Sequence, residues 1–169
     1  GRSGTVSAAV EAAFFDVPAI AVSMYIPVRE DVTFETITAE YDAYGEATRA
    51  AAYLAEHALG AGVFEHADYL NVNAPMAGGE YGPLNDGEHA QLAITEPSRV
   101  YQMGAVQDGK EIQLYDRIWE QMADGDIPDA NGTDRRAVVD GKVSVSPLTA
   151  PHTSEYHEAL DALAETYPA

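Results

Sequence analysis

Residues 18–24, Pro-Ala-Ile-Ala-Val-Ser-Met, decide the fold class of this chain. The run is short, continuous and apolar, which is typical of a strand buried on both faces of a parallel sheet. The segment before it carries one apolar helix face at the spacing i, i+3, i+4, i+7 and i+8. The residues of that face are Val6, Ala9, Val10, Ala13 and Phe14. A helix followed by a buried strand is half of a βαβ unit, so the sequence predicts an α/β protein.

A second helix is predicted between residues 45 and 59. Small apolar side chains recur there at helical spacing, and Gly60 and Gly62 then supply a C-terminal stop. Two more helices are expected, one capped by Thr133 and ending near residue 139, and one over residues 153–165. The expected buried stripe of the 45–59 helix is Ala47, Ala51, Leu54, Ala55 and Ala58.

Three further core strands are expected, over residues 69–73, 92–95 and 143–146. Strand-like residues also lie on both sides of the dipeptide Asp108–Gly109. Because Asp-Gly accommodates the positive φ of a type I′ turn, this dipeptide predicts the centre of a β-hairpin.

The charge of the chain is far from that of an average globular protein. It has 28 Asp and Glu against 9 Lys and Arg, which gives a formal net charge of −19 over 169 residues. Such a surface repels itself in dilute buffer, whereas salt near 1 M shortens the Debye length to about 3 Å and screens most of the repulsion. We interpret the composition as that of a protein from a high-salt cytoplasm; an acidic protein from a low-salt cell is the alternative.

Composition argues against several classes of function. Neutralising a DNA or RNA backbone needs clustered basic side chains, and the only adjacent basic pair is Arg135–Arg136. No apolar run approaches the ~20 residues that span a bilayer, and no signal peptide is visible. Without cysteine there is no disulfide and no thiolate metal site. We expect a cytoplasmic protein that binds neither nucleic-acid polymers nor membranes.

The start of the chain places two hydroxyls and a glycine, Ser3, Gly4 and Thr5, at the beginning of the first helix. Free N–H groups and the positive end of the helix dipole favour an anion there. The glycine would let an oxyanion approach the backbone closely. Ser and Thr are also ordinary helix N-caps, so spacing alone leaves two interpretations, a phosphate site and a plain cap.

No complete catalytic set is visible in the chain. The five histidines lack H-E-x-x-H spacing, and no G-x-S-x-G or G-x-G-x-x-G motif occurs. The acidic loop over residues 124–134 does not fit a calcium-binding EF-hand. With Gly132 at position 6 of such a loop, Ile127 and Val138 would occupy positions 1 and 12, and neither can bind the ion.

Three blocks of the sequence occur in a specific order. Residues 3–23 contain Ser-Gly-Thr-Val-Ser-Ala-Ala-Val-Glu-Ala-Ala-Phe and then Pro-Ala-Ile-Ala-Val-Ser. Residues 70–75 read Leu-Asn-Val-Asn-Ala-Pro, and residues 132–148 contain Gly-Thr-Asp and end in Val-Ser-Val-Ser-Pro-Leu. Together these blocks resemble the S-G-T-V-x-A-A-x-E-x-x-F, L-N-V-N-x-P and G-T-D-x-x-A-V-x-x-G-Y-V-S-I-T-P-L stretches of the SurE-type survival-protein nucleotidases. Lys142 stands where that family has its tyrosine.

The resemblance implies a fold and an activity. The fold would be a Rossmann-like three-layer α/β core in a single domain over residues 1–169, with a protruding β-hairpin arm over about residues 91–120 and with its N-terminal strands missing from this chain. The activity would be hydrolysis of nucleoside monophosphates with a divalent metal, Mg²⁺ or Mn²⁺. Members of the family assemble as homodimers or homotetramers through such arms and tails.

The resemblance also implies where the chemistry is incomplete. The family's metal ligands, an Asp-Asp pair, a Ser and an Asn, all precede the S-G-T block and are therefore not in this chain. We expect Ser3, Gly4 and Thr5 to bind phosphate, and we assign no catalytic residue and no metal ligand. The chain alone is then expected to be an inactive part of a nucleotidase. The alternative is a non-catalytic remnant or assembly module that keeps the α/β core.

The charge makes a prediction about stability. The melting temperature should rise steeply with KCl between roughly 0.1 and 2 M, because screening relieves repulsion on a −19 surface. Thermal unfolding followed by circular dichroism across this range measures the effect. A melting temperature that is independent of salt would overturn the high-salt interpretation.

Overall fold

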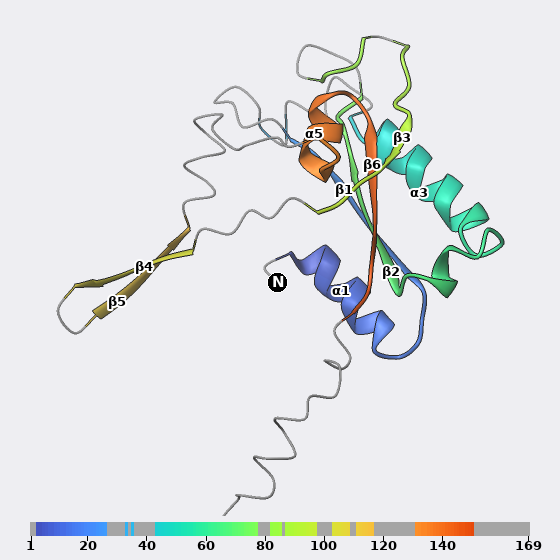
Figure 1. Ribbon diagram of the computed structural model, residues 1–169. Coiled ribbons are helices and arrows are strands. Elements are labelled where there is room, and N and C mark those ends of the chain that lie inside the picture. Colours follow the sequence, from blue (N-terminus) through green and yellow to red (C-terminus); the bar gives the residue numbers. More distant parts are fainter. Residues whose placement is uncertain are drawn as a thin grey trace, which may run out of the picture.

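The structure is a computed structural model that describes residues 3–26, 33, 35, 43–77, 82–85, 87–97, 103–108, 111–116 and 131–150. Of residues 103–108 and 111–116 it describes the backbone. Figure 1 shows a central sheet with helices on both sides and a two-stranded hairpin that stands apart from it. The predicted helix over residues 153–165 and most of the acidic loop over residues 124–134 lie outside the described residues.

The central sheet has four strands in the order β1-β2-β6-β3. They are β1 (Ala19–Met24), β2 (Tyr69–Ala74), β6 (Val143–Leu148) and β3 (Leu92–Ile94). β1 runs parallel to β2, β6 runs antiparallel to β2, and β3 runs parallel to β6. The core strands predicted from the sequence are all present, but the sheet is mixed rather than purely parallel.

The expectation that β1 is buried on both faces is wrong for the described residues. In this strand Ala21 is buried and the other residues are half-buried. The reason is its position, because β1 is an edge strand of the described sheet and only β2 pairs with it there. β2 lies between two neighbours, and Leu70, Val72 and Ala74 are almost completely buried.

One face of the sheet is covered by α3 (Gly45–His57). Its buried alanines and Leu54 pack against Leu70 and Val72 of β2 and Val143 and Val145 of β6. The predicted stripe is partly wrong, since Ala55 is exposed. The stripe observed follows spacings of three and four and consists of Ala47, Ala50, Leu54 and Ala58, with Ala51 half-buried beside it.

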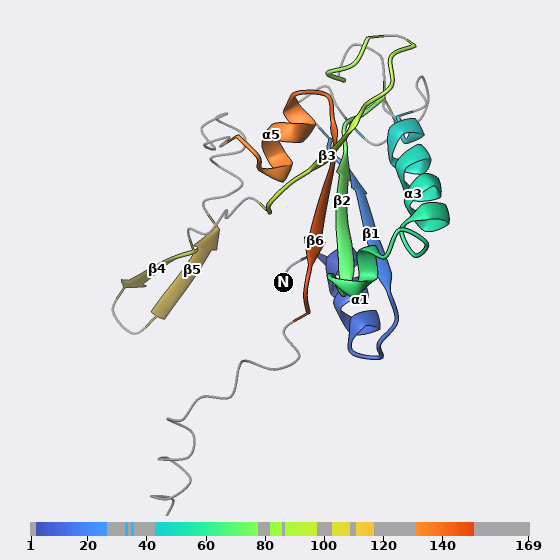
Figure 2. The same ribbon diagram turned by 45° about the vertical axis from the view of Figure 1, so that its right-hand side comes forward.

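The other face carries α1 (Gly4–Ala13) and α5 (Asp134–Val139), as the two views in Figures 1 and 2 show. Ala9 and Ala13 of α1 form a cluster with Ala21 of β1 and Tyr69 of β2. Phe14, which was expected on this face, is 49% exposed because the helix ends at Ala13. Helices on both faces confirm the three-layer α/β core. No helix in the described part of the chain is both long and apolar enough to cross a membrane.

The hairpin consists of β4 (Met103–Asp108) and β5 (Glu111–Asp116), which form a separate two-stranded sheet. Asp108 pairs with Glu111, so it belongs to the ladder and not to the centre of a turn, as the prediction on Asp108–Gly109 had it. The hairpin itself is confirmed by the antiparallel pairing of β4 with β5. β3 lies in the central sheet, and the described hairpin begins at Met103.

The buried carboxylate of Glu46 connects α3 to the segment before β3 through hydrogen bonds. Glu46 is 2% exposed, and its carboxylate accepts hydrogen bonds from the Arg49 guanidinium, from His89 Nδ1 (2.8 Å) and from the Ala90 N–H (3.0 Å). Arg49 also donates to the Ala90 carbonyl oxygen. Burial alone would raise the pKa of Glu46, but these hydrogen bonds and the Arg49 charge hold it below its usual value. The ionised carboxylate therefore stabilises the folded chain.

Glu46→Gln should lower the free energy of unfolding near pH 7 by about 1.5–3 kcal/mol, the usual contribution of a hydrogen bond to a charged group. The folded-state pKa is depressed, so this stabilisation is present above the ordinary value of 4.5 and is lost as the pH falls through the folded-state pKa. The difference in melting temperature between wild type and Glu46→Gln should therefore shrink as the pH is lowered through this range. Glu56→Gln is the matched control, because the Glu56 side chain is 75% exposed on the same helix. A difference that persists unchanged in acid would show that the Glu46 charge is not involved.

Candidate site at the start of α1

Ser3 caps α1. Its Oγ accepts a hydrogen bond from the Val6 N–H at 3.3 Å, and its backbone carbonyl accepts from the Ser7 N–H at 2.9 Å. The prediction of an N-cap at Ser3 or Thr5 is thus confirmed for Ser3. Gly4 and Thr5 form the first turn, and the side of the helix that carries them is exposed. The structure therefore brings Ser3, Gly4 and Thr5 together at one accessible helix N-terminus.

The first turn of α1 points towards the carboxyl ends of β1 and β2. The end of α1 lies beside the start of β1 at Ala19, because the Val17 N–H donates to the Ala12 carbonyl at 3.1 Å. The helix runs back along the sheet from there, so its beginning lies nearer to α5 than its end does (Figure 2). In open α/β sheets, ligands bind outside the carboxyl ends of the parallel strands. The start of α1 therefore has the orientation that a ligand site of this fold requires.

The sheet face beneath α1 changes from apolar to polar towards the carboxyl ends of β1 and β2. The first row across the strands is Ala19, Tyr69 and Leu148, and it packs under the helix. The next two rows lie closer to the carboxyl ends of β1 and β2. They are polar in β2 and β6, with Asn71 and Asn73 half-buried. In register, these rows are Ala21, Asn71 and Ser146, and then Ser23, Asn73 and Ser144.

Three hydroxyls on this face form a buried cluster. Thr95 Oγ1 lies 2.8 Å from Ser144 Oγ and 2.9 Å from Ser146 Oγ, and both serines are fully buried. Each hydroxyl carries one proton, so two hydrogen bonds within the cluster use two of its three donors. The third donor remains for an acceptor outside the cluster. Because a buried polar group is costly unless it is hydrogen-bonded, the cluster marks a polar interior on this side of the sheet.

The described residues do not form a metal site. Nowhere in the described ranges do three His, Asp or Glu side chains come together in a way that could hold an ion. The start of α1 offers donors and no carboxylate, which is the chemistry of an anion site and not of a cation site.

Sequence reasoning found the first turn of α1 but missed two other features. The polar rows were visible in principle, because Leu-Asn-Val-Asn in residues 70–73 and Val-Ser-Val-Ser in residues 143–146 alternate apolar and polar residues. Glu46 was missed because a carboxylate in the first turn of a helix is usually a surface residue. Its partner His89 is 43 positions away and gives no local signal.

Comparisons with known proteins identify the family of the chain. The family model described as Survival protein SurE matches residues 1–103. The chain is 69% identical to a 5'-nucleotidase SurE of Haloarcula marismortui, over 99% of the chain and 59% of that protein. It is 55% identical to one of Halobacterium salinarum, over 99% of the chain and 60% of that protein. The chain thus spans about three-fifths of the length of these relatives.

A solved structure shows the same fold. The SurE protein from Aquifex aeolicus is 27% identical and superposes with a TM-score of 0.54, covering 96% of this chain and 58% of the other. The family match covers more than half of the chain, and the identity to the archaeal relatives extends over nearly all of it. The chain therefore belongs to the SurE survival-protein family.

Proposed function

We propose that this chain is the phosphate-binding part of a 5'/3'-nucleotidase that hydrolyses nucleoside monophosphates to nucleoside and inorganic phosphate. The relatives at 55–69% identity carry the name 5'-nucleotidase SurE, which supports this class of reaction. The observation that carries the proposal is the set of unused hydrogen-bond donors at the start of α1. A high-salt cytoplasm and assembly as a homodimer or homotetramer are parts of the same proposal.

Two backbone donors at this helix start have no acceptor among the described residues. The Ser7 N–H bonds to the Ser3 carbonyl and the Val6 N–H bonds to Ser3 Oγ, so capping accounts for both. The N–H groups of Gly4 and Thr5 are the remaining donors of the first turn. They point out of the helix end together with the positive end of its dipole, where a phosphate oxygen is stabilised.

The cap and the phosphate interpretations of Ser3 are compatible. A serine hydroxyl has one proton to donate and two lone pairs to accept with. Ser3 Oγ uses one lone pair for the Val6 N–H, and its proton remains available for a phosphate oxygen. The Thr5 hydroxyl is a fourth donor in the same turn. Two N–H and two O–H groups could thus hold a phosphoryl group and stabilise the charge that develops on its oxygens during hydrolysis.

Gly4 leaves room for this anion. A Cβ built at Gly4 would meet no atom within 4 Å among the described residues, so the space in front of the turn is open. A valine there would fit the protein but would occupy that space and restrict the backbone. Gly4 is therefore a position where loss of activity can be separated from loss of folding.

The proposed hydrolysis uses Mg²⁺ or Mn²⁺. The described residues form no metal site, and we expect the metal ligands in a segment that precedes Ser3. The outer edge of β1 has no partner strand among the described residues, so further strands could pair there. A non-catalytic remnant that keeps the α/β core is the alternative. Supplying the ligand-bearing segment separates the two, since only the first becomes a metal-dependent phosphatase.

In an enzyme completed with that segment, Gly4→Val should abolish hydrolysis of nucleoside monophosphates. Thr5→Ala should reduce kcat about 10- to 150-fold, since one hydrogen bond to a charged oxygen contributes about 1.5–3 kcal/mol. Ser3→Ala should reduce kcat in the same range and also cost about 1 kcal/mol of stability through the lost cap. Rates and melting temperatures are measured on the same preparations.

Gly60→Val is the matched control, because Gly60 follows the other long helix and a Cβ there makes only an ordinary 3.8 Å contact with the His57 carbonyl. It should keep wild-type turnover. Wild-type turnover in all three α1 variants, whatever their stability, would remove this helix start from the mechanism.

A further inference from the structure

Two asparagines of β2 carry side-chain amides that the fold leaves unused. Leu70 and Val72 pack against α3, so the alternate residues Asn71 and Asn73 face the side of α1, and both are half-buried. Neither amide makes a hydrogen bond within the described part of the chain, and neither has a fully enclosed polar atom. Each amide offers two N–H donors and an acceptor oxygen. The pair therefore presents both donors and acceptors to a group that approaches this face.

The neighbours of these asparagines do not satisfy them. The two serines opposite them on β6 bond instead to Thr95, at 2.8 and 2.9 Å between the oxygens. On the other side, Asn73 lies opposite Ser23 of β1, and the Ser23 hydroxyl has no hydrogen bond among the described residues either. Ser23, Asn71 and Asn73 together form what we call the polar floor of the α1 face.

The polar floor lies at the height of the first turn of α1. The helix runs opposite to β1, as Figure 2 shows, and it also contacts β2. Its end and the start of β2 meet in one cluster, which contains Ala13 and Tyr69. From Ala13 to Gly4 the helix rises by about 13 Å, and from Tyr69 to Asn73 β2 rises by about the same distance. A phosphate held by the Gly4 and Thr5 N–H groups would therefore sit on the same face and at the same height as Asn73.

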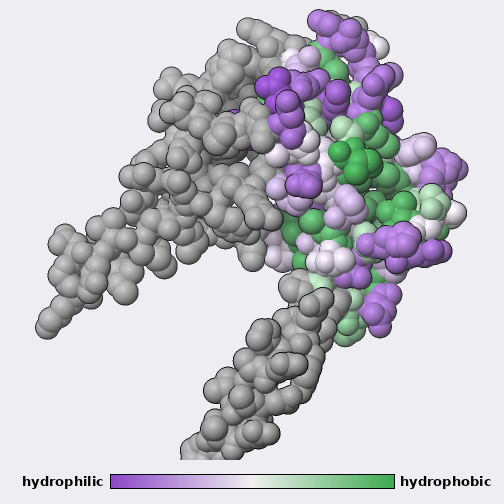
Figure 3. Space-filling view, viewed as in Figure 1, coloured by the Kyte–Doolittle hydropathy of each residue, from purple (hydrophilic) through white to green (hydrophobic). Residues whose placement is uncertain are grey.

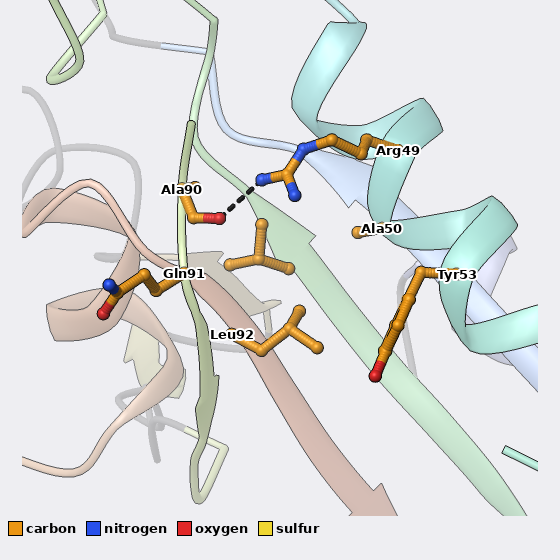
Figure 4. A pocket seen from close by; sticks show the side chains of 7 residues that line it. Arg49, Ala50, Tyr53, Ala90, Gln91 and Leu92 are labelled. Carbon is orange, nitrogen blue, oxygen red and sulfur yellow. Dashed lines mark hydrogen bonds between the residues drawn. The ribbon is translucent and has the colours of Figure 1, made fainter. Parts of the chain in front are cut away.

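The opposite face offers no comparable set of groups among the described residues. A hollow of about 300 Å³ lies there between α3 and β3, on a side of the molecule where hydrophobic residues reach the surface (Figure 3). Its lining includes Ala50 and Leu92. Arg49 at its rim already donates to Glu46 and to the Ala90 carbonyl, the second of which Figure 4 shows. A hydroxylated ligand thus finds more free hydrogen-bonding groups on the α1 face.

We propose that the polar floor binds the sugar hydroxyls of a ribonucleotide whose phosphate is held at the start of α1. A hydroxyl group both donates and accepts, so the neighbouring 2'- and 3'-hydroxyls of a ribose match side-chain amides, which also do both. A site that hydrogen-bonds a substrate hydroxyl discriminates against the analogue that lacks it. The substrate class is therefore ribonucleotides in preference to 2'-deoxyribonucleotides. This inference rests on the proposed function, which supplies the phosphate.

Other polar ligands match the polar floor less well. An ionised carboxylate or a second phosphate dianion accepts hydrogen bonds but donates none, so it would leave the amide oxygens unpaired. A nucleobase is commonly held by stacking on an aromatic side chain, and none of Ser23, Asn71 and Asn73 is aromatic. The sugar is the part of a nucleotide that uses both the donors and the acceptors of the floor.

The test compares adenosine 5'-monophosphate with its 2'-deoxy analogue, with the chain in about 2 M KCl so that diffuse charge effects are screened. Calorimetry should give the ribonucleotide about three- to tenfold higher affinity, the usual effect of one neutral hydrogen bond. In ¹⁵N NMR spectra, the side-chain NH₂ resonances of Asn71 and Asn73 should shift with the ribonucleotide. They should stay unchanged with inorganic phosphate, which is expected to bind only at α1.

Three variants locate the site. Asn73→Ala should abolish the preference for the ribonucleotide and Asn71→Ala should reduce it, while both keep the affinity for inorganic phosphate. Neither change takes a hydrogen-bond partner from a described group, so the melting temperatures should stay close to that of wild type. Asn85→Ala is the matched control and should keep the preference, because Asn85 is an exposed asparagine whose amide donates to Glu88.

The outcomes separate this inference from the proposed function. Equal affinity for the two nucleotides, or a preference that survives Asn73→Ala, would overturn the sugar site and leave the phosphate site at α1 intact. Absence of saturable binding of inorganic phosphate and of both nucleotides would overturn the two together.

Discussion

The pairing of β2 with β1 on one side and β6 on the other determines what each face of the molecule can do. In this register Leu70 and Val72 face α3, and Asn71 and Asn73 face the side of α1 and α5. A slip of one residue would exchange these sets, because side chains alternate strictly along a strand. Two side-chain amides would then lie under the alanines of α3, where each unpaired group costs about 1–3 kcal/mol.

The two faces consequently present different chemistry. The α1 face combines a capped helix start with rows of amides and hydroxyls, and it leaves the Gly4 and Thr5 N–H groups without an acceptor among the described residues. The α3 face is apolar and ends in a hollow with the guanidinium of Arg49 at its rim. Ser3 serves the fold as the cap of α1, and its hydroxyl proton is not used by the cap hydrogen bond.

Local features of the sequence predicted much of this structure. The apolar run of β1, the alternation in β2 and β6, and the caps Ser3 and Thr133 are short-range signals, and the elements that they indicate are present. The features that were missed depend on distant contacts. The antiparallel direction of β6 follows from how the chain returns to the sheet, and the burial of Glu46 follows from His89 and Ala90 in another segment.

The candidate site was predictable to the same degree. Ser3, Gly4 and Thr5 could be found because a hydroxyl and a glycine at a helix start have a known use. The polar rows of the sheet lie on the face that carries α1 because of the β1–β2–β6 register, which periodicity alone does not give. Burial of β1 was overestimated because its composition resembles a central strand, while its position is at an edge of the sheet that the described residues form.

Backbone amide NMR of the ¹⁵N-labelled chain, titrated with inorganic phosphate in high KCl, tests the central claim most directly. The amide resonances of Gly4 and Thr5 should shift in a saturable manner, because these N–H groups are the unused donors of the first turn. The amides at the start of the shorter helix α5, around Asp134, should shift much less. Shifts of equal size at both helices, or saturable shifts that leave Gly4 and Thr5 unchanged, would contradict the assignment of the phosphate site to α1.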